Sequence, residues 1–129
     1  MVTTIRFKIN SLPQTRNSIG AKHWRYRHKE SKLWHDLVYL EICGQIPPKP
    51  FTKVELSFIR ASSSMPDYDG LVSSFKYVLD ALVKHGVLID DNLNVCSNPS
   101  YKWIKTKRGQ GYIQVEVKQC SMTVETKSS

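Results

Sequence analysis

Hydrophobic and polar residues alternate near both ends of the chain, as they do in strands that have one buried face. Over residues 2–10, Ile5, Phe7 and Ile9 fall on one side and Arg6 and Lys8 on the other. This pattern predicts a half-buried strand. The same alternation predicts further strands at Val54, Leu56 and Phe58 and at Ile113, Val115 and Val117.

Between the first two of these strands the period changes to that of a helix. From about residue 22 to residue 43, Leu33, Leu37 and Leu40 recur at three- and four-residue spacing, flanked by Trp34 and Val38. This spacing predicts a helix with a leucine stripe on the core. A glycine and a pair of prolines follow and are expected to end it.

A turn-rich segment over residues 61–70 leads to a second predicted helix, which a glycine at the C-cap, Gly86, is expected to end. A short apolar run follows at 87–89, and residues 101–106 form a plausible strand. The turn at 109–111 then predicts a hairpin between this strand and the last one. The buried face of the second helix is expected to consist of Leu71, Phe75, Val78, Leu79 and Leu82.

The order of these elements predicts an α+β fold. We expect a single domain with a mixed sheet of about four to five strands, packed with two main helices. The domain is expected to cover residues 1–120, and residues 121–129 to form a polar C-terminal tail.

Composition narrows the class of protein. The chain has 129 residues, a hydrophobic content of 40% and a net charge of +8, with a pI near 9.5. These values fit a globular protein that meets a polyanion such as nucleic acid. No apolar run reaches the length of a membrane helix, no signal-peptide pattern is present, and three scattered cysteines match neither a disulfide framework nor a zinc pattern. We therefore expect a cytoplasmic protein without a membrane partner.

Acidic residues gather within this basic chain. Of its eleven acidic residues, the aspartates at 67, 69, 80, 90 and 91 all fall within one short stretch. Carboxylate oxygens suit Mg²⁺ or Mn²⁺, and Mg²⁺ is typically held by one or two carboxylates together with substrate phosphates. If residues 67–69 are extended, Asp67 and Asp69 point the same way, and two such aspartate clusters can converge on one metal. A calcium loop is excluded, because the third ligand and the glutamate at position twelve are missing.

Simpler interpretations of the same residues stay open. Asp69, Ser73, Lys76 and Asp80 share one side of the second predicted helix, which is also the pattern of a solvated polar face. Lys76 and Asp80 could be an ordinary i,i+4 ion pair, and Asp69 could be only a helix N-cap.

Basic residues form two groups, which we take as candidate DNA-binding surfaces, although charge runs are often only solvated faces. Aromatic residues lie among them, and nothing in the pattern indicates that bases are read. The histidines have no spacing that favours a common metal site. The first group is Lys22, Arg25, Arg27, Lys29 and Lys32, with His23 and His28, and the second is Lys102, Lys105, Lys107 and Arg108.

Residues 66–91 carry a family resemblance. The segment Pro-Asp-Tyr-Asp-Gly, followed by Lys76 and by Asp-Ala-Leu-Val-Lys-His-Gly-Val-Leu-Ile-Asp-Asp, resembles the signature of RusA-type Holliday junction resolvases of phages and prophages. The loop from Leu12 to Asn17 and the pair at 23–24 resemble the start of that family. Two features depart from its pattern: Gly70 stands in place of an asparagine, and seven residues instead of four separate Asp69 from Lys76.

The resemblance implies a homodimeric, Mg²⁺-dependent endonuclease that nicks four-way DNA junctions symmetrically, with Mn²⁺ as a possible substitute. By motif, the metal-binding and catalytic aspartates fall on Asp67, Asp69 and Asp91, and the catalytic lysine on Lys76. Two alternatives stay open. The chain could be a non-catalytic protein that binds branched DNA through a degenerate RusA-like site, or a metal nuclease for another branched DNA.

Overall fold

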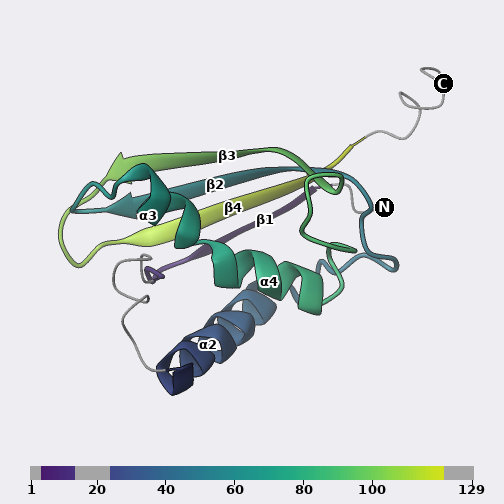
Figure 1. Ribbon diagram of the computed structural model, residues 1–129, viewed down its shortest axis with the longest axis horizontal. Coiled ribbons are helices and arrows are strands. Elements are labelled where there is room, and N and C mark those ends of the chain that lie inside the picture. Colours follow the sequence, from purple (N-terminus) through teal and green to yellow (C-terminus); the bar gives the residue numbers. More distant parts are fainter. Residues whose placement is uncertain (1–3, 14–23, 121–129) are drawn as a thin grey trace.

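The computed structural model describes residues 4–13 and 24–120, with the side chains of 24–27 left out of the description. Within these residues the chain forms one sheet of four strands with helices packed against it (Figure 1). The elements are β1 (Thr4–Ile9), α2 (Trp24–Ile42), β2 (Val54–Ser62), α3 (Tyr68–Ser73), α4 (Lys76–Lys84), β3 (Cys96–Lys105) and β4 (Tyr112–Gln119).

The strand order is β1-β4-β2-β3, so the sheet is mixed. β4 pairs antiparallel with both β1 and β2, and β3 pairs parallel with β2 at the edge. The predicted α+β fold with one mixed sheet is therefore confirmed.

One face of the sheet carries the core. Phe7, Val115 and Phe58 lie side by side across three strands and are all buried. The residues that alternate with them along each strand, such as Arg6 and Gln114, are exposed on the opposite face. The alternation in the sequence thus translates directly into one buried and one solvated face. The helices cover the buried face, because their apolar residues belong to the same core cluster.

The core-facing stripe of α2 differs from the predicted one. Trp34, Val38 and Ile42 are buried at four-residue spacing, whereas Leu33 and Leu40 are 47% and 70% exposed. The helix has two neighbouring apolar stripes, and only one of them can face the sheet. Burying a tryptophan removes more apolar area from water than burying a leucine, which favours the observed orientation.

The second predicted helix is two short helices. α3 ends at Ser73 and α4 begins at Lys76, with the backbone amide of Ser74 donating to the carbonyl of Gly70 at 3.0 Å. Phe75 lies at the break, buried against Phe58. The break preserves the predicted buried face, of which only Leu79 is not fully buried. Gly86 has a φ of +85°, as expected for the glycine that ends α4.

The predicted hairpin is wrong. β3 and β4 are consecutive in the chain, but β2 lies between them in the sheet. The turn does exist, since the amide of Gln110 donates to the carbonyl of Lys107 at 3.0 Å and Gly109 has a φ of +84°. It connects strands that are not neighbours, because alternation specifies which face a side chain takes and not which strand lies alongside. β3 also begins earlier than predicted, at Cys96.

Several predictions fall on residues outside the described ones: the first residues of the first strand, most of the segment from Leu12 to Asn17, Lys22 and His23 of the first basic group, and residues 121–129. Among the helices that are described, none is both long and apolar enough to cross a membrane.

Candidate functional site

Asp67 is the N-cap of α3. Its backbone is extended, with φ −73° and ψ 170°, and its Oδ1 accepts a hydrogen bond from the amide of Gly70 at 2.7 Å. Asp69 lies in the first turn of the same helix and is exposed. The prediction that both aspartates project from one extended segment is wrong, and the N-cap is Asp67 instead of Asp69. Both carboxylates nevertheless lie at a helix N-terminus, where the helix dipole favours negative charge.

The loop before β3 separates the roles of Asp90 and Asp91. Both oxygens of Asp90 are engaged, one by the amide of Asp91 at 2.7 Å and the other by the side-chain amide of Asn92 at 3.1 Å. Asp91 is exposed, and its carboxylate accepts no hydrogen bond from the residues that the structure describes. Asp90 therefore shapes the loop, and Asp91 is the member of the pair whose oxygens are available to a ligand.

Strand β3 runs between the two aspartate segments. Burial, followed by the charges of Asp91 and Asp90, raises the pKa of the Cys96 thiol to about 11. Burial also raises the pKa of Tyr101, with smaller contributions from Tyr68 and Cys96. The charges of Asp90 and Asp91 thus act on Cys96 at the start of β3. Tyr68, the residue between Asp67 and Asp69, acts on Tyr101 further along the same strand.

The two segments lie toward different ends of β3. The chain reaches Asp67 from the end where β2 and β3 both finish, whereas the 90–91 loop leads into the start of β3 (Figure 1). Within residues 4–13 and 24–120 no three His, Cys, Asp or Glu side chains are arranged to hold a metal ion. The three-carboxylate site of Asp67, Asp69 and Asp91 thus stays a prediction. The donor chemistry itself suits a hard cation, because all three offer carboxylate oxygens.

Lys76 is the first residue of α4, so it does not share a helix with Asp69. Its amine lies 3.9 Å from a carboxylate oxygen of Asp80, and its side chain is 70% exposed. The ordinary i,i+4 pair that the spacing allowed is therefore present. An exposed pair of this kind leaves the amine free to exchange partners at little cost.

The second basic group lies at the same end of the sheet as Asp67. Lys105 pairs in register with Ser62, the last residue of β2, and the amide of Thr106 donates to the carbonyl of Ser62 at 3.0 Å. Lys107 and Arg108 follow in the exposed turn. We call Lys105, Lys107 and Arg108 the basic turn. Lys102, also exposed, lies further back along β3.

The first basic group is only partly described. Lys29 is exposed on α2, and Lys32 is exposed but lies 3.2 Å from Asp36. Arg25 and Arg27 belong to α2 by their backbone, and Lys22 lies outside the described residues.

Tyr68 is a candidate that the sequence analysis missed. It lies between Asp67 and Asp69, and 69% of it is exposed. Trp103, by contrast, is half-buried, and its indole nitrogen donates to the hydroxyl of Ser62 at 2.9 Å. An exposed aromatic ring beside carboxylates can stack on an unpaired base. The signal in the sequence was the tyrosine inside the Asp-x-Asp motif.

No protein-family model and no curated protein matches this chain.

Proposed function

We propose that this protein is a Mg²⁺-dependent endonuclease of the RusA type, which resolves four-way DNA junctions by paired symmetric nicks. The observation that carries the proposal is the position of two exposed aspartates, Asp67 and Asp69, at the end of the sheet that also bears the basic turn. Carboxylates and cations at the same end of a sheet suit a site that handles a metal and a phosphate together. The motif at residues 66–91 supports the same reaction class.

Asp67 and Asp69 would hold the metal. Asp91, the third aspartate of the motif, lies toward the other end of β3, so it would join the same metal only if the 90–91 loop moved toward α3. Asp67 has one oxygen committed to the α3 cap and keeps the other for a ligand. When bound, the metal would activate water and stabilise negative charge on the phosphate and the leaving oxygen. The need for only one or two protein carboxylates per Mg²⁺ makes the α3 pair sufficient as an anchor.

The cations of the chain would position the DNA backbone. Lys105, Lys107 and Arg108 make no ion pair with the described carboxylates. They would contact phosphates that flank the scissile bond, and such contacts carry no sequence information. Lys76 would leave its ion pair with Asp80 and add its positive charge near the reacting phosphate. Tyr68, which is exposed, would stack on a base exposed at the branch point.

Paired nicks on a junction with two-fold character require two active sites, so we propose a C2 homodimer. We further propose that it acts in the cytoplasm of a bacterial or phage-infected cell.

The direct test is incubation of the purified protein with a synthetic four-way junction, with and without Mg²⁺ or Mn²⁺. Metal-dependent nicks on opposing strands, absent in Asp69→Asn, support the proposal. Junction binding without cleavage in any divalent ion would instead indicate a binding protein with a degenerate site. Cleavage restricted to another branched DNA would support the nuclease activity but assign it a substrate other than the four-way junction.

A further inference from the structure

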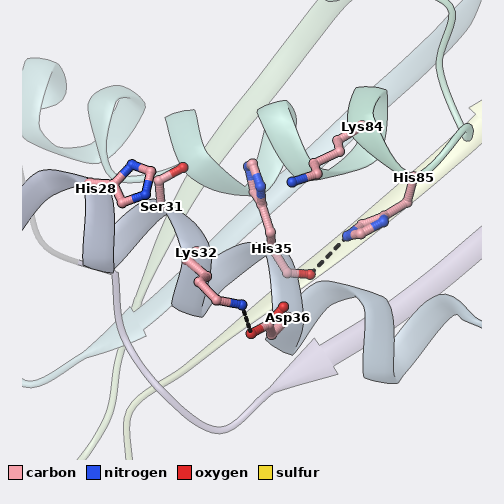
Figure 2. Close-up of a pocket in the computed structure, with 7 residues that line it drawn as sticks. All are labelled: His28, Ser31, Lys32, His35, Asp36, Lys84 and His85. Atoms are coloured by element: carbon pink, nitrogen blue, oxygen red, sulfur yellow. Dashed lines mark hydrogen bonds and ion pairs between the residues drawn. The ribbon is translucent and has the colours of Figure 1, made fainter.

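A pocket of about 330 Å³ lies between α2 and α4 and includes none of the aspartates of the proposed metal site. Figure 2 shows side chains from both helices converging on it. Its walls are rich in nitrogen-bearing side chains and include a single carboxylate. The residues that matter for its chemistry are His28, Lys32, His35 and Asp36 on α2 and Lys84 and His85 at the end of α4.

His85 fixes the two walls of the pocket relative to one another. Its Nε2 lies 3.0 Å from the backbone carbonyl of His35. A carbonyl oxygen only accepts hydrogen bonds, so Nε2 of His85 must carry the hydrogen. The ring of Tyr39 packs against the same imidazole, with 5.0 Å between ring centroids. The pocket is therefore preformed by contacts between the helices.

The two lysines of the pocket differ in their partners. Lys32 lies 3.2 Å from Asp36, which offsets its charge. Lys84 is exposed, and none of the described carboxylates lies within ion-pair distance of it. In Figure 2 its amine points toward the ring of His35. The pocket thus holds one lysine that makes no ion pair with the described carboxylates.

The charge of Lys84 affects the pKa of His35. Burial and then Lys84 lower its pKa, and His85 lowers it further, while Asp80 and Asp36 raise it. Its Nε2 is enclosed and has no hydrogen-bond partner among the described residues. A buried polar atom left unpaired is costly, so a ligand that pairs with Nε2 is favoured. In the tautomer with its hydrogen on Nε2, His35 donates to an acceptor atom of the ligand, and Lys84 favours a ligand with negative charge.

We propose that the α2–α4 pocket binds a phosphate group, carried either by a nucleotide or by the terminus of a nucleic-acid strand. Lys84 provides the ion pair, and His28 and His35 provide hydrogen-bond donors. The volume is at the lower end of the range for small-molecule pockets, which suits a phosphate with part of the group that carries it. This site is separate from the proposed nuclease site and does not depend on it.

The same geometry argues against a metal ion in this pocket. A cation would be repelled by the amine of Lys84, and the Nε2 lone pair of His85 is not available because that atom carries a hydrogen. Among the described residues, no three His, Cys, Asp or Glu side chains are arranged to hold a metal ion. An anion meets none of these obstacles.

Phosphate binding is expected to raise the pKa of His35. After burial, the charge of Lys84 is the main cause that lowers this pKa, while Asp80 and Asp36 raise it. A bound anion offsets the repulsion from Lys84 and therefore acts in the same direction as the two aspartates.

The test is a titration of the full-length protein with inorganic phosphate at constant ionic strength. The histidine ring protons are monitored by NMR at each phosphate concentration. We expect saturable shifts of the His28 and His35 resonances and an upward shift of the pKa of His35. Lys84→Gln should weaken phosphate binding by about tenfold or more, because it removes a charge-assisted contact. The matched control is Lys49→Gln, which removes an exposed lysine after α2 and should leave binding unchanged.

The source of the phosphate is resolved by two further ligands. A single-stranded oligonucleotide with a 5′-phosphate is compared with the same strand ending in a hydroxyl, and a nucleoside monophosphate is titrated separately. A preference for the phosphorylated strand assigns the pocket to strand termini, and saturable binding of the mononucleotide alone assigns it to nucleotides. Shifts that stay linear with phosphate concentration, or that are equal in wild type and Lys84→Gln, would overturn the proposal.

Discussion

The carboxylate of Asp67 accepts a hydrogen bond from the backbone amide of Gly70 at 2.7 Å, and this contact begins helix α3. The residue is thus both a structural cap and a proposed metal ligand. The two roles use different properties of the side chain, because a cap needs an oxygen acceptor and a metal ligand needs the negative charge. Substitutions that keep one property and remove the other separate them.

Asp67→Asn should keep the cap and lose the metal, whereas Asp67→Ala should lose both. We expect the alanine variant to be destabilised by about 1 kcal/mol and the asparagine variant by much less. Both should lose cleavage. Urea unfolding gives the stability and a junction assay the activity. Full cleavage by Asp67→Asn would remove this residue from the metal site.

Asp69→Asn and Asp91→Asn should abolish cleavage and keep or tighten DNA binding. Neither carboxylate supports the fold through a described hydrogen bond, and removing negative charge reduces repulsion from phosphate. Asp80→Asn is the matched control, since its described partner is Lys76 and its effect should be mild. Gel-shift and cleavage assays on one junction measure both properties. Loss of binding together with cleavage in both variants would mean that the aspartates maintain the fold.

Stability should fall as the pH rises from about 9 to about 11. Burial raises the pKa of Cys96 from 9.0 to about 11, so in this window the thiol ionises in the unfolded chain and stays neutral in the folded one. The unfolded state then holds fewer protons, and the free energy of unfolding decreases with pH. Urea midpoints at a series of pH values measure the fall.

Cys96→Val should make this fall shallower. Part of it should persist above about pH 10, because burial also raises the pKa of Tyr101. An identical pH dependence in wild type and Cys96→Val would show that the Cys96 thiol does not contribute.

Removing the basic turn should weaken DNA binding independently of sequence. Replacing Lys105, Lys107 and Arg108 with alanine should flatten the plot of log affinity against log salt by about 0.9 for each lost phosphate contact. The matched comparison replaces Arg25, Lys29 and Lys32, of which Lys32 already has Asp36 as a partner. Fluorescence anisotropy at several salt concentrations gives the slopes. An unchanged slope in the folded basic-turn variant would place the DNA elsewhere.

The active protein should be a dimer of the 14.9 kDa chain. Light scattering at micromolar concentration, with and without junction DNA, measures the mass. A monomer under both conditions would contradict paired nicking by a symmetric enzyme.

Much of the fold could be predicted because β1, β4 and most of β2 alternate strictly enough to define their buried faces. Ile5, Phe7 and Ile9 are buried as their spacing indicated. Strand neighbours could not be predicted, because pairing between distant segments leaves no local periodicity, and the turn at 109–111 suggested a hairpin that β2 interrupts. The face of α2 was ambiguous, because Leu33 and Trp34 begin two adjacent apolar stripes.

The candidate site also has features that the sequence indicated and features that it could not indicate. Residue type and motif selected Asp67, Asp69 and Asp91 as ligands of one metal, and this stays a prediction, because Asp91 lies toward the other end of β3 from Asp67 and Asp69. The sequence could not show that Asp67 caps α3 or that Ser74 and Phe75 divide the helix, since both depend on backbone hydrogen bonds and on tertiary packing. Nor did the scattered histidines reveal the α2–α4 pocket, which forms only when His35 and His85 meet across two helices.

The most direct test of the nuclease proposal is a single-turnover assay on a four-way junction labelled on each strand in turn. With Mg²⁺, the wild-type protein should produce nicks at symmetric positions on two opposing strands, leave linear duplex intact, and stop on addition of EDTA. Asp69→Asn should bind the same junction and cut neither strand. Tight junction binding by wild type with no nick in Mg²⁺ or Mn²⁺ would contradict the assignment of Asp67, Asp69 and Asp91 to catalysis.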